Sequence, residues 1–178
     1  MPTFVDHDPK LFLTLVGDGR CISNECYRTN NVTVERGGSI VIPAFAVGRT
    51  QSLLYYLYKL KEKNRIPDIP IYLNSPMATS VSDLYCKHSK SHKLNDKEIA
   101  DICNVAQFVR TQEESIALNR SPSPMIIISA SGMATGGRVL HHLKRFLPDD
   151  KSTILFTGSS LVEPIFVSSN NGKKFYSN

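Results

Sequence analysis

The sequence lacks several features that would assign it to a functional class at once. None of its apolar runs approaches the roughly 18 residues that a helix needs to cross a bilayer. The opening residues MPTFVDHDPK lack the basic and then apolar order of a signal peptide. Its four cysteines form no CxxC pair, so neither a disulfide framework nor a zinc ribbon is indicated. We therefore expect a cytoplasmic protein with free thiols and no membrane partner.

Histidines are also few, and their spacing does not indicate a metal site. His141 and His142 are adjacent on one expected helix, so their side chains point about 100° apart and do not both face one metal easily. His88 and His92 are four residues apart but lack the glutamate of an HExxH arrangement. We expect all of them to be surface or structural residues, with no metal ligand and no catalytic residue in this chain.

The composition is that of an ordinary globular protein. Of the 178 residues, 41% are hydrophobic and 21% are charged, which argues against disorder and favours one domain with a real core. A net charge of +5 permits a polyanionic partner without requiring one. The basic residues gather in short clusters, which are more typical of solvated helix faces.

Short β-branched runs alternate with amphipathic stretches from residue 37 onward. This alternation predicts an α/β fold: a doubly wound, mostly parallel sheet with helices on both faces. We expect strands near 39–44, 69–74, 125–130 and 152–157, and helices near 49–63, 112–119 and 137–147. The expected domain spans 37–158, after a divergent segment over 1–36 with no sustained periodicity and before a divergent, flexible tail over 159–178.

Two turns that join a strand to a helix are the candidate binding elements, because open α/β sheets bind ligands at such places. The first is PAFAVGRTQ, where Arg49 and Thr50 stand at a helix start. Unpaired amides and the positive end of the helix dipole suit an anion there, and Arg49 can hold a phosphate with two hydrogen bonds. The alternative is an ordinary tight turn with Arg49 on the surface.

The second turn is SASGMATGGRV. Its glycines allow backbone geometries that side chains forbid, and its hydroxyls can bind an anion; the residues concerned are Gly132, Gly136, Gly137, Ser131 and Thr135. The loop lacks the lysine of a Walker A motif and does not fit GxGxxG, so a P-loop-like nucleotide-binding module is the weaker alternative. Simple turn chemistry explains a glycine-rich loop equally well.

Three long motifs, taken together, resemble one known family. VIPAFAVGRTQSLLYYLYKL, IPIYLNSPMA and MIIISASGMATGGRVLHHLK followed by ILFTG are very similar to the β-CASP region of metallo-β-lactamase-fold RNA-processing hydrolases. That family includes relatives of ribonuclease J and of the endonuclease of the cleavage and polyadenylation machinery. The resemblance covers roughly residues 34–158. It implies that the GRTQ turn, Ser75 of the SPMA turn and the SGMATGG loop, including Met133, border a cleft through which RNA passes.

The resemblance also implies a metallo-β-lactamase domain with two zinc ions that activate water for phosphodiester hydrolysis. This sequence has no HxHxDH motif, and its five histidines cannot supply the family's ligand set. We therefore expect no cofactor in this chain and zinc only in the complete family enzyme. RNA is the expected partner, a metallo-β-lactamase domain in cis or trans is a second one, and an oligomer is left open.

Three functions compete on this basis: a zinc-dependent RNA hydrolase, a substrate-handling domain that contacts RNA phosphates, and an inactive fragment. The missing ligands weigh against the first for this chain alone. We therefore predict a β-CASP substrate-handling domain that is inactive by itself.

Overall fold

The computed structural model describes residues 12–16, 30–91, 93–122 and 124–157, with only the backbone of 12–16. They form a six-stranded sheet in the order β1-β6-β2-β5-β3-β4, in which every neighbouring pair is parallel. The strands are β1 (Phe12–Val16), β2 (Ile40–Pro43), β3 (Ile71–Leu73), β4 (Gln107–Phe108), β5 (Ile126–Ser129) and β6 (Thr153–Thr157).

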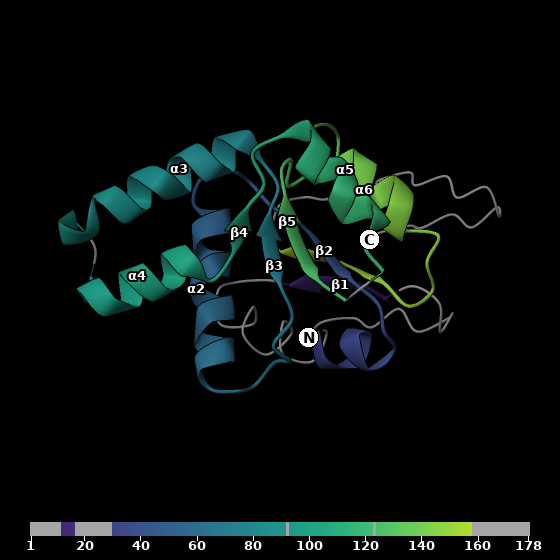
Figure 1. The fold of residues 1–178 in the computed structure, drawn as a ribbon, viewed down its shortest axis with the longest axis horizontal. Helices are drawn as coiled ribbons and strands as arrows, with labels where there is room; N and C mark the ends of the chain where they lie inside the picture. Colours follow the sequence, from purple (N-terminus) through teal and green to yellow (C-terminus); the bar gives the residue numbers. More distant parts are fainter. Residues whose placement is uncertain (1–11, 17–29, 92, 123, 158–178) are drawn as a thin grey trace.

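Helices cover both faces of this sheet (Figure 1). One face carries α2 (Arg49–Glu62), α3 (Pro76–Lys87) and α4 (Asp96–Asn104), and the other carries α5 (Gln112–Arg120) and α6 (Val139–Phe146); a short 3₁₀ helix, Ser89–Ser91, follows α3. The order of the connections explains this division. The chain moves outward along the sheet from β2 to β4 and then returns, and right-handed crossovers place the returning helices on the opposite face.

Two hydrophobic cores follow from the alternation of side chains along each strand. Ile40 and Ile42 of β2 pack with α2 on one face, whereas Val41 between them packs with α6 on the other. All three are fully buried, as expected for a strand covered on both faces. The predicted α/β, doubly wound parallel sheet is confirmed.

The segment before residue 37 contributes more regular structure than its sequence pattern predicts. β1 pairs with β6 over its whole length, and residues 30–35 are helical. The buried hydroxyl of Thr33 lies 2.7 Å from that of Thr153, which ties this helical turn to β6. The sheet therefore extends across the expected boundary at residue 37, while residues 159–178 lie outside the described part of the chain.

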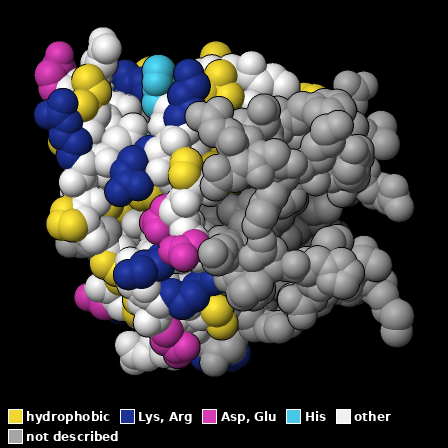
Figure 2. Space-filling model, turned by 90° about the vertical axis from the view of Figure 1, so that its right-hand side faces the viewer, with side chains coloured by type: hydrophobic (Ala, Val, Ile, Leu, Met, Phe, Trp, Pro, Cys, Tyr) yellow, Lys and Arg dark blue, Asp and Glu magenta, His cyan; other side chains and the backbone are white. Residues whose placement is uncertain are grey.

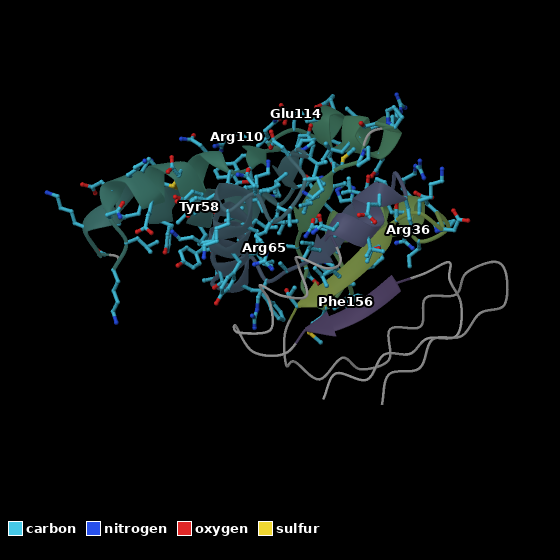
Figure 3. The ribbon with its side chains drawn as sticks, turned by 90° about the horizontal axis from the view of Figure 1, so that it is seen from below. Arg36, Tyr58, Arg65, Arg110, Glu114 and Phe156 are labelled. Atoms are coloured by element: carbon cyan, nitrogen blue, oxygen red, sulfur yellow. A yellow bond between two sulfur atoms is a disulfide. The ribbon has the colours of Figure 1, made fainter. Side chains whose placement is uncertain are left out.

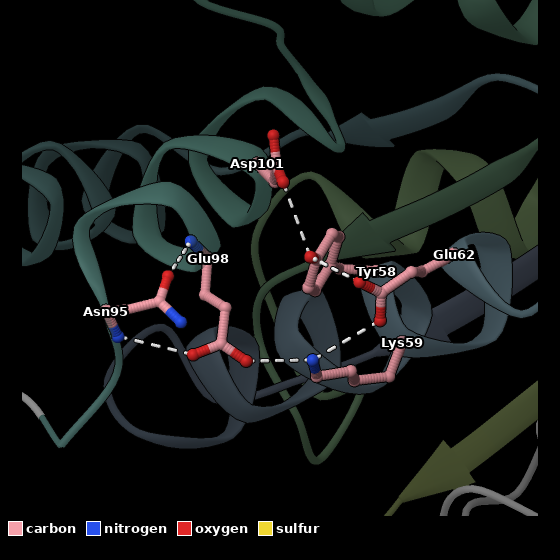
Figure 4. A network of polar contacts seen from close by, with 6 residues as sticks. All are labelled: Tyr58, Lys59, Glu62, Asn95, Glu98 and Asp101. Atoms are coloured by element: carbon pink, nitrogen blue, oxygen red, sulfur yellow. Dashed lines mark hydrogen bonds and ion pairs between the residues drawn. The ribbon is translucent and has the colours of Figure 1, made fainter.

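A polar network joins α2 to α4 at the edge of the first face (Figure 4). Lys59 donates to Glu98 at 2.8 Å and to Glu62 at 3.3 Å, and the single hydroxyl proton of Tyr58 is shared between Glu62 at 3.0 Å and Asp101 at 3.3 Å. Burial and the hydrogen bond to Glu62 raise the pKa of Tyr58 to about 12. The hydrogen bond from Lys59 lowers the pKa of Glu98. At neutral pH, Tyr58 therefore keeps its proton while Lys59, Glu62 and Glu98 are ionised.

The prediction of free thiols is wrong for two of the four cysteines. Cys86 of α3 and Cys103 of α4 form a disulfide with a Cα–Cα distance of 6.2 Å. The two helices pack side by side, and this brings together cysteines that are 17 residues apart in sequence. Cys21 and Cys26 lie outside the described residues.

The surface of the described residues is mixed in character. On the face shown in Figure 2, Lys and Arg side chains are dispersed among acidic and apolar ones. In the part of the chain that the structure describes, no helix is both long and apolar enough to span a bilayer.

Candidate functional site

The candidate site lies where three neighbouring strands end. β2 pairs with β5 through Pro43 and Ser129, and β5 pairs with β3. Because parallel strands end at the same edge of a sheet, the connections over residues 44–48, 74–75 and 130–138 emerge side by side. The helix after β2 covers one face and the helix after β5 covers the other. This edge is therefore a topological switch point, the position at which open α/β sheets bind ligands.

The connections after β2 and β5 touch each other at Gly132. A Cβ atom added to Gly132 would lie 2.8 Å from the amide nitrogen of Phe45 and 3.1 Å from the carbonyl carbon of Ala44. Only a residue without a side chain permits this approach. The predicted convergence of the GRTQ turn and the SGMATGG loop is therefore confirmed.

Two buried polar side chains fix the turn between β2 and α2. The hydroxyl of Thr50 donates to the carbonyl of Phe45 at 2.7 Å. The Gln51 amide donates to the carbonyl of Ala46 at 3.2 Å, and its oxygen accepts from the amide of Gly48 at 2.8 Å. Thr50 is only 1% exposed, so its proton is committed to the protein and its role in this structure is to brace the turn.

Arg49 is the first residue of α2, and only its side chain is available to bind a ligand, because its amide already donates a hydrogen bond within the turn. The amide of Arg49 donates to Val47 at 3.0 Å, and that of Thr50 donates to Phe45 at 3.2 Å. The prediction of unpaired amides at this helix start is therefore wrong for these two residues. The Arg49 guanidinium, which is partly exposed, has neither a hydrogen bond nor an ion pair within the described residues.

The connection after β5 closes on itself and leaves several amides free. The amide of Ser131 donates to the carbonyl of Gly136 at 3.3 Å, and the amide of Ala134 donates to that of Ser131 at 3.1 Å. Several other amides find no acceptor among residues 12–16, 30–91, 93–122 and 124–157, including those of Gly132, Met133, Thr135 and Gly136. A group of free N–H donors in a tight loop is an arrangement that binds anions.

The end of this loop requires a glycine. Other residues of the loop have side chains that are exposed or partly exposed to solvent. Gly137 has a φ of +77°, and a Cβ there would lie 2.7 Å from the carbonyl oxygen of Ala130. Met133 and Thr135 are exposed, and Ser131 is partly exposed. The loop therefore presents hydroxyls and amides together.

The third connection begins α3. Ser75 is the N-cap of this helix, and its Oγ accepts from the amide of Ala78 at 3.3 Å. Ser75 is 4% exposed, whereas Met77 two residues later is 65% exposed. The cap fixes the helix start, and Met77 projects from it at the same edge of the sheet.

A buried polar network beneath the loops was missed by the sequence reasoning. The side-chain nitrogen of Asn74, which is fully buried, lies 2.6 Å from Nε2 of His142 and 2.7 Å from the hydroxyl of Ser115. Nδ1 of His142 lies 2.6 Å from Oδ1 of Asn119. Because Asn74 donates to Nε2, His142 is assigned as neutral with its proton on Nδ1. Burial, with the charges of His141 and Arg138, lowers the pKa of His142 to about 4.

Arg138 links this network to a fourth connection. Its guanidinium donates to Oδ1 of Asn74 at 2.9 Å and to the carbonyls of Val109, Arg110 and Thr111 at 3.4 Å each. All of these acceptors are neutral oxygens. Arg138 therefore holds the end of β4 against the site and brings a positive charge to the same edge.

The connection after β4 is fixed at the start of α5. A carboxylate oxygen of Glu114 accepts from the amides of Arg110 at 2.8 Å and Thr111 at 3.1 Å, and Figure 3 shows Arg110 beside Glu114. These two hydrogen bonds are the main reason that the pKa of Glu114 is lowered. Arg110 also pairs with Asp83 of α3 at 3.2 Å.

One signal in the sequence could have indicated the role of His142. It falls on the same helical stripe as Val139, Leu143 and Phe146, and all four are buried. A histidine on an apolar stripe indicates a buried, hydrogen-bonded ring, and the expectation of a structural histidine is confirmed here. His141 is exposed, as a surface histidine is expected to be. The partners of Asn74 and Arg138 have no comparable signal.

The described residues do not offer a zinc-binding set. Within that part of the chain, no group of three or more His, Cys, Asp or Glu side chains lies close enough to hold a metal ion.

Comparison with known proteins places this arrangement in a family. The model of the Beta-Casp domain matches residues 50–163. Ribonuclease TTHA0252 of Thermus thermophilus is 41% identical over 133 residues, which cover 71% of this chain and 30% of that protein. An RNase J-like protein of Methanocaldococcus jannaschii is 34% identical over 130 residues, which cover 71% of this chain and 29% of that protein.

A third relative is named for a different activity. Transcription termination factor FttA of Methanosarcina mazei is 32% identical over 133 residues, which cover 71% of this chain and 21% of that protein. The chain therefore spans between about a fifth and a third of the length of these relatives. Because the domain match extends over more than half of its residues, the chain belongs to the β-CASP family.

Proposed function

We propose that this chain is the substrate-handling β-CASP part of a zinc-dependent metallo-β-lactamase-type RNA hydrolase, and that its carboxyl edge contacts RNA phosphates. Relatives with 32–41% identity are named ribonuclease or transcription termination factor, and both names refer to proteins that act on or with RNA. RNA is accordingly the proposed partner of this chain.

The observation that carries the proposal is the meeting of two kinds of anion-binding group at one switch point. The Arg49 guanidinium has no partner within the described residues, and the free amides of Gly132, Met133, Thr135 and Gly136 lie on the connection that touches the Arg49 turn. Arginine and clustered amides both bind phosphate oxygens well. Their presence on two turns that touch at Phe45 and Gly132 is what supports phosphate binding.

The predicted residues have different parts in this proposal. Arg49 supplies charge, and the amides of Gly132, Met133, Thr135 and Gly136 supply directed donors. The hydroxyls of Ser131 and Thr135 add donors at the same loop. Thr50 and Gly137 act through the backbone, because one braces the turn and the other allows the loop to close. Ser75 sets the start of α3 beside them.

Hydrolysis belongs in this proposal to the complete protein. A metallo-β-lactamase domain, in cis or in trans, would hold the zinc ions and activate water, while the present chain binds and orients the RNA. The larger size of the relatives supports this division, since most of their length lies outside the region shared with this chain. The chain alone is proposed to be catalytically inactive.

The direct experiment measures binding of a fluorescent single-stranded RNA by the 178-residue chain, with anisotropy recorded over a series of salt concentrations. Phosphate contacts predict an affinity that falls linearly with the logarithm of salt concentration. Unlabelled RNA should displace the probe, and ATP at equal phosphate concentration should displace it poorly. If ATP binds more tightly than the RNA, the chain is a nucleotide-binding module and the proposal is wrong.

A further inference from the structure

Large apolar side chains are exposed around the proposed phosphate site. Seven such side chains are exposed in the described part of the chain, and four of them lie just after β2, β3 or β5: Phe45 and Val47 before α2, Met77 in the first turn of α3, and Met133 before α6. Their exposed fractions are 42%, 65%, 65% and 45%. Apolar side chains that gather at one edge, where ligands of such sheets bind, indicate a binding surface more than chance exposure does.

Phe45, the aromatic residue of this group, has a backbone fixed by hydrogen bonds and a ring that is exposed to solvent. The carbonyl of Phe45 accepts from both the amide and the hydroxyl of Thr50, and the amide of Ala44 donates to Ser129 of β5 at 3.0 Å. The ring itself lies against Gly132, because an added Cβ there would be 3.0 Å from Cδ2 of Phe45. A ring fixed in this way loses little conformational entropy when it binds a partner.

The surroundings of the ring favour a negatively charged partner. Residues 44–49, 74–77 and 130–138 contain two arginines and no aspartate or glutamate. Arg49 follows Phe45 by four residues, and the free amides of the SGMATGG loop begin at Gly132, which the ring touches. The partner that fits must therefore combine anionic groups with flat apolar faces. Single-stranded nucleic acid has both.

We propose that Phe45 is a stacking platform for a base of single-stranded RNA, with Val47, Met77 and Met133 as its apolar border. This inference rests on the proposed function, because the phosphates on either side of the stacked base would be those bound by Arg49 and the loop amides. Base-stacking does not depend on sequence, since every base has a π-face. The platform adds affinity for any base and none for a bare sugar–phosphate chain.

The test compares two labelled probes on the 178-residue chain: a short oligouridylate and an abasic oligomer with the same sugar–phosphate backbone. Phe45→Ala should weaken oligouridylate binding by roughly fivefold to a hundredfold, as is usual for loss of one stacked base, and leave abasic binding within about twofold. Val32→Ala is the matched control. Val32 is 44% exposed on the helical segment before β2, at the opposite edge of the sheet, and its loss should change neither affinity.

A second variant serves if Phe45→Ala proves to be misfolded by circular dichroism. The chain has no tryptophan, so Phe45→Trp introduces a single tryptophan at the platform, and its emission can be excited separately from that of the seven tyrosines. Its emission should be quenched by oligouridylate and unchanged by the abasic oligomer. Quenching that depends on the base supports the proposal independently of any change in affinity.

Each contrary result has its own meaning. If the wild-type chain binds neither probe, the proposed phosphate site fails and the platform with it. If both probes bind but Phe45→Ala affects them equally or not at all, phosphate binding stands and the platform is wrong. If light scattering shows a dimer that Phe45→Ala dissociates, with no dependence of binding on the base, the surface contacts a second copy of this chain and not RNA.

Discussion

Asn74 and His142 are 68 residues apart in the sequence, yet the side-chain nitrogen of Asn74 lies 2.6 Å from Nε2 of His142 in the buried network under the candidate site. A proton added to Nε2 would face the Asn74 NH₂ group, which is itself a donor. Burial, together with the charges of His141 and Arg138, keeps His142 neutral in the folded protein and lowers its pKa to about 4.

The first prediction concerns pH. Between the ordinary histidine pKa of 6.5 and about 4, the unfolded chain takes up a proton that folded His142 does not. Above pH 6.5, His142 should therefore not change the free energy of unfolding. Between pH 6.5 and about 4, this free energy should fall by up to about 1.4 kcal/mol per pH unit, which amounts to roughly 3 kcal/mol over the whole range. Urea unfolding at several pH values measures this. His142→Gln should flatten the dependence, and His88→Gln, at an exposed position outside this network, should leave the dependence unchanged. If the free energy of unfolding of His142→Gln depends on pH as steeply as that of the wild type, groups other than His142 cause the dependence.

The second prediction concerns the contact between the two turns. Gly132→Ala places a Cβ against the backbone of Phe45 at 2.8 Å, and backbone cannot give way as a flexible side chain can. We expect the free energy of unfolding to fall by about 1–3 kcal/mol, or the loop to shift with weaker RNA binding. Gly136→Ala is the matched control in the same loop, because its Cβ would meet nothing within 4 Å. Equal stability and equal RNA affinity for the two variants would contradict the close approach.

The third prediction concerns the disulfide between α3 and α4. Removing a bond that closes a loop of this size lowers the free energy of unfolding by about 2–4 kcal/mol. Thermal unfolding of the wild-type chain should therefore shift downward on reduction, whereas the Cys86→Ser, Cys103→Ser double variant should be insensitive to reductant. Mass spectrometry of an unreduced digest should find the peptides of Cys86 and Cys103 joined. If these peptides are separate, the pairing is wrong for the protein in solution.

The fourth prediction concerns zinc. Since the sequence lacks the HxHxDH motif and the described residues contain no ligand cluster, the purified chain should carry no stoichiometric zinc and should not cleave RNA. Elemental analysis and a cleavage assay decide this. One or two tightly held zinc ions per chain, with cleavage lost to a chelator, would overturn the division of roles proposed here.

Much of the fold was predictable because its strands are continuous apolar runs. Ile40–Pro43 and Ile126–Ser129 are buried along their whole length, and each is bounded by turn residues. Once these strands are placed in one parallel sheet, their following turns must meet at one edge, which is how the convergence at Gly132 could be predicted. The helical turn at 30–35 was not predictable in this way, since it has no apolar periodicity.

The details of the site depend on contacts that no local pattern records. The Thr50 hydroxyl could donate outward to a ligand or inward to a carbonyl, and only the path of the turn decides that it donates to Phe45. Arg138 reaches Asn74 from 64 residues away. Cys86 and Cys103 meet because of helix packing and not because of their spacing. Long-range partners of this kind require the tertiary structure.

The proposal that this edge binds RNA phosphates depends most on Arg49, and one comparison tests it directly. Arg49→Ala and Lys63→Ala each remove one positive charge from α2, the first at its start and the second at its C-cap, where Lys63 is exposed. The measurement is the dissociation constant for single-stranded RNA over a series of salt concentrations. Arg49→Ala should weaken binding across RNA sequences and reduce the slope of log K against log salt by about 0.7, the contribution of one phosphate contact in a single strand. Lys63→Ala should leave both quantities close to wild type. Identical affinity and slope for wild type and Arg49→Ala would contradict the account.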